Sequence, residues 1–278
     1  MNDRNEIYDF YNNGAEIGRL ERGLGKVEFY RTTEIFAQYL PLDRSDCRKV
    51  IYDVGGGIGR YSRWLASYGH EVHLLELAEN AVKYAKEHLM KDWITFTAET
   101  ADARHLPRPD NSADVVLLMG PLYHMQKEED RAAALREARR VLKDGGLLMT
   151  AGISKYSSTT WALSVYGRDN DYIDDPIFFD MLRGELTTGH HNRPKEYPYL
   201  IAESYFATPY SFADEMEHAG FTVINSHAVE GCIWFTPHLE EKWENAESRK
   251  RLLEIVHLTE HDREMMGMSP HFIVVGRK

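Results

Sequence analysis

Residues 50–59 read Val50-Ile-Tyr-Asp-Val-Gly-Gly-Gly-Ile-Gly59, and this stretch decides the fold. A short apolar run ends at Asp53, the glycines Gly55, Gly57 and Gly59 follow at alternate positions, and a helical pattern begins at once. Glycine tolerates the positive φ of a tight turn and lets a ligand approach the backbone, and the N-terminus of a helix offers unpaired N–H groups. The stretch therefore predicts a strand, a glycine turn and a helix that together bind a nucleotide-like ligand.

The spacing of the glycines distinguishes between two kinds of ligand. The dinucleotide motif G-x-G-x-x-G would need its third glycine at position 60, which is Arg60. The pattern here is D-x-G-x-G-x-G, with Asp53 before the glycines. An acid at this place suits a ligand with a positively charged amino group and would repel a pyrophosphate. The motif therefore disfavours a nicotinamide cofactor.

An acid also ends the next predicted strand. Residues 71–75 are mostly apolar, and Glu76 follows them about 20 residues beyond the glycine turn, where nucleotide-binding folds place the acid that binds the ribose. A carboxylate can accept hydrogen bonds from both ribose hydroxyls. Leu77 comes next, placed to lie against an adenine ring.

Three further strands follow in the same rhythm. Residues 94–98 form the third predicted strand, 113–119 a fully buried fourth strand, and 141–149 a helix end, a glycine turn and the fifth strand. Strands that alternate with helices in this way indicate right-handed crossovers and one parallel sheet.

These five features, in this order and spacing, resemble the class I S-adenosylmethionine-dependent methyltransferases. The tail of the fourth strand, Gly120-Pro-Leu-Tyr-His-Met, is similar to a bacterial branch that acts on small molecules. The resemblance implies an α/β, Rossmann-like sheet of seven strands, mostly parallel with one antiparallel strand and with helices on both faces. It also implies an N-terminal helical lid and a long insertion after the fifth strand.

The same resemblance implies a set of cofactor contacts. Asp102 would accept a hydrogen bond from the adenine amino group, and the backbone of Ala103 would donate one to the ring. A carbonyl of Met119 or Gly120 would hold the amino group of the methionine. The lid would supply a donor for the methionine carboxylate, and the candidates there are Tyr11, Tyr30 and Arg31.

Four segments of one structural domain are expected along the chain. They are an N-terminal lid (1–40), the cofactor-binding core (41–151), a substrate-binding insertion rich in aromatic residues (152–208), and a completion of the sheet (209–278). The aromatic residues of the insertion could form a cage for an amine. Helices are expected at residues 25–40, 58–68, 80–89, 128–142, 211–219 and 239–261, and two more strands at 221–226 and 272–275.

His124 is the first choice for a catalytic base. It follows the fourth strand at the edge where open α/β sheets bind ligands, and an unperturbed pKa near 6.5 suits proton removal near neutrality. The same histidine could instead brace the loop through a backbone carbonyl. Its neighbour Tyr123 would pack against the site or gate it.

Charge and composition exclude several classes of protein. The 278 residues include 33 basic and 44 acidic side chains, a net charge of −11 that would repel a nucleic acid. No apolar run approaches the roughly 20 residues that cross a bilayer, and the polar N-terminus is unlike a signal peptide. Two isolated cysteines suit a reducing cytoplasm. We therefore expect a cytoplasmic monomer or homodimer without a metal, acting on a small molecule or a peptide.

Three functions are compatible with these patterns. The leading one is methyl transfer from S-adenosylmethionine to a nitrogen or oxygen atom of the acceptor by in-line displacement. The second is a non-catalytic module that senses S-adenosylmethionine or its product S-adenosylhomocysteine. The third, a nicotinamide-dependent oxidoreductase, is disfavoured by Arg60.

Overall fold

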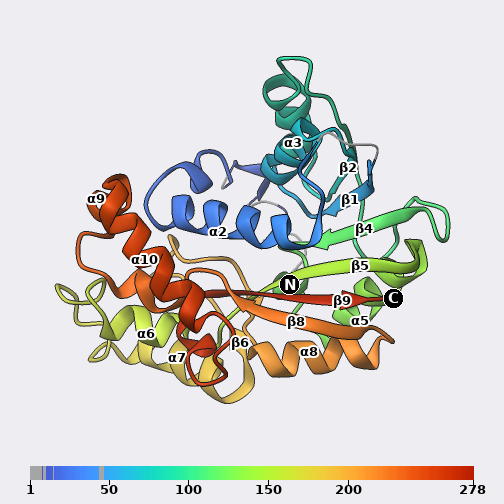
Figure 1. Ribbon diagram of the computed structural model, residues 1–278. Coiled ribbons are helices and arrows are strands. Elements are labelled where there is room, and N and C mark those ends of the chain that lie inside the picture. The colour runs from blue at the N-terminus through green and yellow to red at the C-terminus, as the bar shows by residue number, and fades with distance from the viewer. Residues whose placement is uncertain (1–7, 9–10, 15, 44–46) are drawn as a thin grey trace.

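The computed structural model describes residues 8, 11–14, 16–43 and 47–278, so residues 1–7, 9–10 and 15 of the expected lid lie outside the described part. Within it, seven strands form one sheet in the order β3-β2-β1-β4-β5-β9-β8 (Figure 1). The strands are β1 (Val50–Val54), β2 (Glu71–Glu76), β3 (Thr97–Thr100), β4 (Ala113–Leu118), β5 (Leu142–Ile153), β8 (Thr222–Ala228) and β9 (His271–Arg277).

The strand directions agree with the expected fold. Strands β1 to β5 pair in parallel, and β9 runs antiparallel to both β5 and β8. The seven-stranded, mostly parallel sheet with one antiparallel strand is confirmed. The expected third strand at residues 94–98 begins later, at Thr97, because Asp92 and Trp93 both have positive φ and turn the chain before it.

Helices cover both faces of the sheet. Each strand alternates its side chains between the two faces. On one face Ile51 packs with α2 (Leu24–Tyr39), α3 (Arg60–Ser67) and α4 (Glu79–Tyr84). On the other face Tyr52 packs with α5 (Glu128–Val141) and α8 (Pro209–His218). The remaining helices are α6 (Ser157–Leu163), α7 (Pro176–Thr188), α9 (Leu239–Glu244), α10 (Ala246–Thr259), the π-helix η2 (Ala85–Leu89), and the 3₁₀ turns η1 (Arg19–Glu21), η3 (Leu122–His124), η4 (Gly231–Phe235) and η5 (Met266–Met268). No helix in the described ranges combines the length and the apolar composition that a membrane span needs.

The single helix expected over residues 239–261 is wrong. The chain breaks at Asn245, whose ψ of 118° is extended, and α9 and α10 lie on either side of it. The Asn245 side chain accepts a hydrogen bond from the backbone N–H of Ser248 and so caps α10. An asparagine at this place satisfies an N–H that the helix itself leaves unpaired, and the apolar periodicity on both sides hides the break.

The insertion between β5 and α8 has a small core of its own. It contains α6, α7 and a two-stranded sheet of β6 (His190–His191) and β7 (Ser204–Tyr205). The rings of Trp161 and Tyr172 lie 4.9 Å apart, and Phe178 is fully buried beneath them. These aromatic rings pack on one another, and none of the three lines the cavity described below.

Candidate active site

The main cavity lies at the carboxyl ends of β1, β2 and β4. Its volume of about 410 Å³ falls within the range of small-molecule sites. The glycine turn after β1 forms its floor, and the ends of β2 and β4 form two walls. The lid contributes Tyr11, Glu16 and Arg19, and the insertion contributes Glu203. The cavity therefore brings together residues from all the predicted segments except the last.

The glycine turn has the backbone conformation that its sequence predicts. The φ angles of Gly55, Gly57 and Gly59 are +66°, +57° and +84°. A Cβ at Gly55 would lie 2.2 Å from Cγ of Pro121, so the turn also fits closely against the segment after β4. Gly55 and Gly57 line the cavity, whereas Gly59 packs against Leu74 at its side. Two of the three glycines therefore face a ligand, and the third allows the turn to enter α3.

Asp53 lies directly behind this turn. Its side chain is fully buried, one carboxylate oxygen accepts a hydrogen bond from Ser62 Oγ at 2.6 Å, and the other has no partner among the described residues. A Cβ at Gly56 would lie 2.5 Å from the carboxylate. Burial raises the pKa of Asp53 to about 6. Residue 56 must therefore be glycine for the charge to sit beneath the cavity floor.

Glu76 fastens the end of β2 to the glycine turn. Its two carboxylate oxygens accept hydrogen bonds from the backbone N–H groups of Gly57 and Ala78, both at 2.8 Å. The side chain is 6% exposed, and burial raises its pKa. Leu77 follows it in the cavity wall. The predicted ribose-binding acid therefore stands at the cavity and also holds the turn in shape.

The opposite wall contains the other predicted cofactor residues. Asp102 and Ala103 line the cavity after β3, and Met119 and Gly120 line it after β4. The Asp102 carboxylate accepts hydrogen bonds from Nε and Nη2 of Arg104, at 3.0 and 2.8 Å. The sequence did not predict this ion pair, because Arg104 follows Asp102 and Ala103 in the chain but is not one of the expected cofactor contacts.

Tyr11 and His124 form a hydrogen-bonded pair in the cavity. The Tyr11 hydroxyl lies 2.5 Å from His124 Nε2, and the two rings meet edge to face at 5.1 Å. On the other side of the imidazole, Ser204 Oγ lies 3.3 Å from Nδ1 and donates its own proton to the Ala202 carbonyl at 2.6 Å. This arrangement favours the tautomer in which Nδ1–H donates to Ser204 and Nε2 accepts from the tyrosine.

Both members of this pair are uncharged near neutral pH. Burial is the main cause that lowers the pKa of His124, to about 4, and the charges of His191 and Arg19 lower it further. Burial also raises the pKa of Tyr11 well above its usual value, and that of the neighbouring Tyr123 as well. The Tyr123 ring packs on His124 with centroids 4.7 Å apart. The structure therefore pairs His124, the predicted base, with Tyr11, a lid residue that was expected to bind the cofactor.

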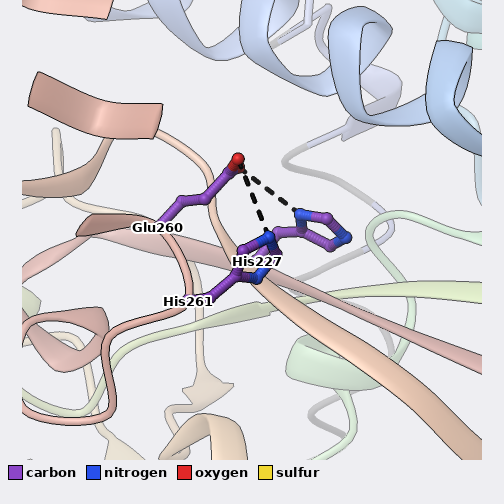
Figure 2. A group of neighbouring side chains, drawn as sticks. All are labelled: His227, Glu260 and His261. Atoms are coloured by element: carbon purple, nitrogen blue, oxygen red, sulfur yellow. Dashed lines mark hydrogen bonds and ion pairs between the residues drawn. The ribbon is translucent and has the colours of Figure 1, made fainter. Parts of the chain in front are cut away.

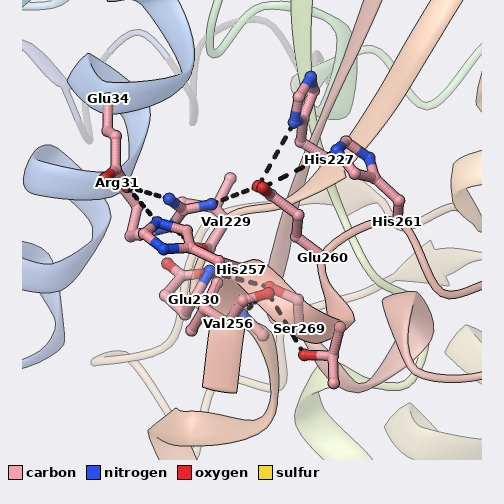
Figure 3. Close-up of polar contacts among 12 residues, drawn as sticks. Arg31, Glu34, His227, Val229, Glu230, Val256, His257, Glu260, His261 and Ser269 are labelled. Carbon is pink, nitrogen blue, oxygen red and sulfur yellow. Dashed lines mark hydrogen bonds and ion pairs between the residues drawn. The ribbon is translucent and has the colours of Figure 1, made fainter. Parts of the chain in front are cut away.

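Arg31 lies away from this cavity, so the expectation that it reaches the methionine carboxylate is not supported. Its fully buried guanidinium donates to the Val229 carbonyl through Nε at 3.1 Å, to Glu260 through Nη2 at 2.5 Å, and also to Glu34 (Figure 3). The helix α2 turns this arginine toward the segment after β8. Arg31 therefore fixes the lid helix to the C-terminal part of the sheet.

The ion pair between Arg31 and Glu260 explains a cluster of side chains that resembles a metal site. One ligand atom each of His227, Glu260 and His261 lie within 4.8 Å of one another, and the Glu260 carboxylate faces both rings (Figure 2). Glu260 already pairs with Arg31, and His261 Nδ1 donates to the Ser226 carbonyl at 2.9 Å. The guanidinium supplies the positive charge that a metal would supply, so we interpret the cluster as a hydrogen-bonded network.

Comparison with known proteins gives the family. A family model described as a methyltransferase domain matches residues 52–150. The ubiquinone/menaquinone biosynthesis C-methyltransferase UbiE of Azotobacter vinelandii is 31% identical over 191 residues, which cover 66% of this chain and 70% of that protein. The chain belongs to the class I S-adenosylmethionine-dependent methyltransferases. The methyltransferase GfsG of Streptomyces halstedii is 36% identical over 120 residues, 41% of each chain.

Solved structures show that this methyltransferase shares its fold with distant proteins. A Pyrococcus horikoshii protein has a TM-score of 0.61 at 13% identity and covers 100% of this chain and 99% of its own. A Methanosarcina mazei methyltransferase has a TM-score of 0.58 at 18% identity and covers 88% and 96%. The cyclase SpnF, with a TM-score of 0.54 at 17% identity over 89% and 80%, shows that the fold alone does not determine the reaction.

The residues of this methyltransferase fit S-adenosylmethionine, which carries a sulfonium and an ammonium group. A buried carboxylate oxygen of Asp53 lacks a partner among the described residues, and a bound cation would offset the cost of burying that charge. Gly55 and Gly57 line the cavity in the left-handed conformation that glycine favours, so a ligand can approach their backbone. Both observations agree with the cofactor of the family.

Sequence reasoning missed two residues of the methyltransferase site. Gly56 lacks a positive φ, so the backbone of the turn does not require a glycine there. Only its contact with Asp53 shows why residue 56 must be small. Arg19 is the lid arginine that lines the cavity, and Glu16 and Glu28 bind its guanidinium. No motif surrounds Arg19, and only the spacing of three charges, at 16, 19 and 28, could have suggested it.

Gly57→Ala is expected to weaken S-adenosylmethionine binding about tenfold, because the Cβ would lie 3.1 Å from Cγ of Glu16 and push this lid side chain within the cavity. The left-handed backbone should also cost about 1–2 kcal/mol of unfolding free energy. Gly69→Ala is the matched control, since Gly69 has a φ of +91° with nothing within 4 Å of its Cβ position. Calorimetry and urea unfolding should show similar stability losses for both variants but weaker cofactor binding only for Gly57→Ala. Equal affinities would contradict the role of the turn.

Proposed function

We propose that this enzyme transfers the methyl group of S-adenosylmethionine to a nitrogen or oxygen atom of a small-molecule or peptide acceptor that enters the same cavity. The observation that carries the proposal is the position of His124. This uncharged imidazole, whose Nε2 accepts a proton, lines the same cavity as the glycine turn and Glu76. A cavity lined by both a cofactor loop and a proton acceptor suits a two-substrate reaction.

In this proposal the cofactor contacts follow the cavity walls. Glu76 would accept hydrogen bonds from the two ribose hydroxyls, and Leu77, Asp102 and the backbone of Ala103 would hold the adenine. The carbonyls after β4, at Met119 and Gly120, hold the amino group of the methionine. The lid residue Arg19 would lie over the remainder, and Asp53 lies behind Gly56, outside the cavity lining.

The chain contributes chiefly alignment and the exclusion of water. The cofactor supplies an electrophilic methyl group on a sulfonium, which an acceptor lone pair attacks in line. Holding two reactants in line can supply roughly 7–11 kcal/mol of the barrier. A base is needed only when the acceptor atom carries a proton that must leave, and His124 is placed to receive it. The net charge of −11 disfavours polyanionic acceptors.

The test begins with calorimetry of the purified protein against S-adenosylmethionine, S-adenosylhomocysteine and NADH. We expect micromolar binding of the first two and none of NADH. A panel of amines, phenols, alcohols and short peptides, incubated with methyl-labelled S-adenosylmethionine, should then yield labelled product. Cofactor binding with no labelled product from any acceptor would contradict the proposal.

Methylation of carbon is a second candidate, and the sequence relatives favour it. Two UbiE proteins, from Azotobacter vinelandii and Ectopseudomonas mendocina, are 31% and 32% identical over 66% of this chain and are named C-methyltransferases. The new methyl group in NMR spectra of the product would distinguish carbon, oxygen and nitrogen by its chemical shift.

The imidazole of His124 is expected to remain neutral, with its proton on Nδ1, from pH 8 down to about pH 5. The measurement is ¹⁵N NMR of histidine-labelled protein, with His124→Asn to assign the signal. The folded pKa of about 4 lies below the unfolded value near 6.5, so protonation favours the unfolded state. The contribution of His124 to stability is thus complete above pH 6.5 and is lost as the pH falls toward 4. Titration of this signal near pH 6.5 would contradict the burial argument.

A further inference from the structure

The hydrogen bond between Tyr11 and His124 places a lid residue in the path of the proton. His124 Nδ1 is committed to Ser204, so only Nε2 can accept a proton. The Tyr11 hydroxyl already occupies Nε2 at 2.5 Å. An acceptor molecule can therefore reach the imidazole only through the tyrosine oxygen or after the tyrosine has moved.

A tyrosine hydroxyl can carry the proton without moving. It donates one hydrogen bond, here to His124, and its oxygen accepts others. Resting on the proposed function, we propose that Tyr11 is a catalytic residue that takes the proton of an acceptor hydroxyl while passing its own to His124. The substrate class is therefore an alcohol or a phenol, and the base is complete only while the Tyr11 hydroxyl bonds His124.

Protons and charge are conserved in this step. The acceptor oxygen forms a bond to the methyl carbon, the carbon–sulfur bond breaks, and its electron pair stays on sulfur. The hydroxyl proton moves to the Tyr11 oxygen as the Tyr11 proton moves to His124 Nε2, and the other ring proton stays on Nδ1, in its hydrogen bond to Ser204. The products are a methyl ether, the neutral thioether S-adenosylhomocysteine, neutral Tyr11 and an imidazolium. The positive charge of the sulfonium has passed to His124, which later releases its proton to water.

The surroundings of the pair explain why the acceptor is a hydroxyl and not an amine. Burial of the imidazole, on which Tyr123 packs, lowers the pKa of His124 and makes it a weak base. A hydroxyl oxygen becomes strongly acidic as the methyl bond forms, and a weak base then suffices. An amine forms an ammonium that keeps its proton against such a base, so an amine would make no use of the relay.

The test uses a series of phenols whose acidity differs, with phenol and 4-methoxyphenol as weak acids and 4-nitrophenol as one that ionises near neutrality. At pH 8, Tyr11→Phe and His124→Asn should each lower kcat on the two weak acids by about 100-fold, as expected for loss of general-base catalysis. Both variants should lower kcat on 4-nitrophenol by less than about threefold, because its proton has already left. A purely structural defect would lower the rates on all three phenols alike.

The matched control is Tyr39→Phe. The Tyr39 hydroxyl bonds Nε2 of His227 at 2.7 Å, the same kind of contact, and Tyr39 does not line the cavity. This variant should leave all three rates within about twofold of the parent. Calorimetry should also find cofactor affinity within about threefold of the parent for Tyr11→Phe. A much larger loss would assign Tyr11 to the cofactor and overturn the relay.

The outcomes separate this inference from the proposed function. If the parent protein methylates amines but none of the phenols or alcohols, the hydroxyl assignment and the relay are wrong, and methyl transfer itself stands. A uniform loss across the phenol series would also overturn the relay. If the parent binds S-adenosylmethionine and methylates no acceptor of any class, the proposed function fails together with the relay.

Discussion

Arg31→Met is expected to lower the free energy of unfolding by about 3–5 kcal/mol and to leave S-adenosylmethionine affinity unchanged. The fully buried guanidinium pairs with Glu260 and Glu34 and donates to the Val229 carbonyl. Removal of one partner from a buried ion pair leaves the other charge uncompensated, which typically costs this much. The effect on the cofactor should be absent, because Arg31 does not line the cavity.

Urea unfolding and calorimetry measure the two quantities separately. Arg48→Met is the control, because the Arg48 side chain is 63% exposed and pairs with Glu71 on the surface, where an ion pair contributes about 0–1 kcal/mol. Arg31→Met combined with Glu260→Gln should regain part of the loss, since both charges are then removed. If Arg31→Met instead bound the cofactor tenfold more weakly with normal stability, Arg31 would belong to the binding site after all.

Glu76→Gln is expected to weaken S-adenosylmethionine binding about 100-fold. The carboxylate accepts from the N–H groups of Gly57 and Ala78 with one oxygen each, and an amide would place an NH₂ group against one of these donors. It would also lose the charge-assisted bonds to the ribose that we propose for this carboxylate, each worth about 1.5–3 kcal/mol. At about 1.4 kcal/mol for each tenfold change, these losses add up to two orders of magnitude in the dissociation constant.

The control for this variant lies on the same strand. Glu71 begins β2 as Glu76 ends it, and its side chain is 44% exposed. Glu71→Gln should bind the cofactor as the parent does. Circular dichroism should show native spectra for both variants, and a Glu76→Gln protein with parental affinity would mean that the ribose is held elsewhere.

The sequence predicted the sheet and the cofactor turn because both depend on local patterns. The apolar runs before Asp53 and Glu76 end where the structure ends β1 and β2, and the positive φ angles at Gly55 and Gly57 follow from the residue type. The residues that form the cofactor turn are close in sequence, so their spacing is enough to predict the turn.

The parts that sequence reasoning missed depend on contacts between distant segments. Arg31 and Arg19 lie on one lid, and the side that each faces depends on how α2 packs against residues some 200 positions away, such as Glu260. Their residue type alone does not distinguish a buried structural arginine from one at the cavity. The pairing of Tyr11 with His124 likewise joins residues that are 113 positions apart.

The position of β9 between β5 and β8 has a consequence for synthesis on the ribosome. Strands β1 to β5 can pair as they emerge, since each neighbour has already been made. Strand β8 pairs only with β9 among the described residues, and β9 is made after it. Until then the nascent chain exposes the open edge of β5 and a strand without a neighbour, both of which invite pairing with other chains. Translation that pauses between residues 229 and 270 would thus hold the protein in its most aggregation-prone form, with most of the cofactor turn and its walls already built.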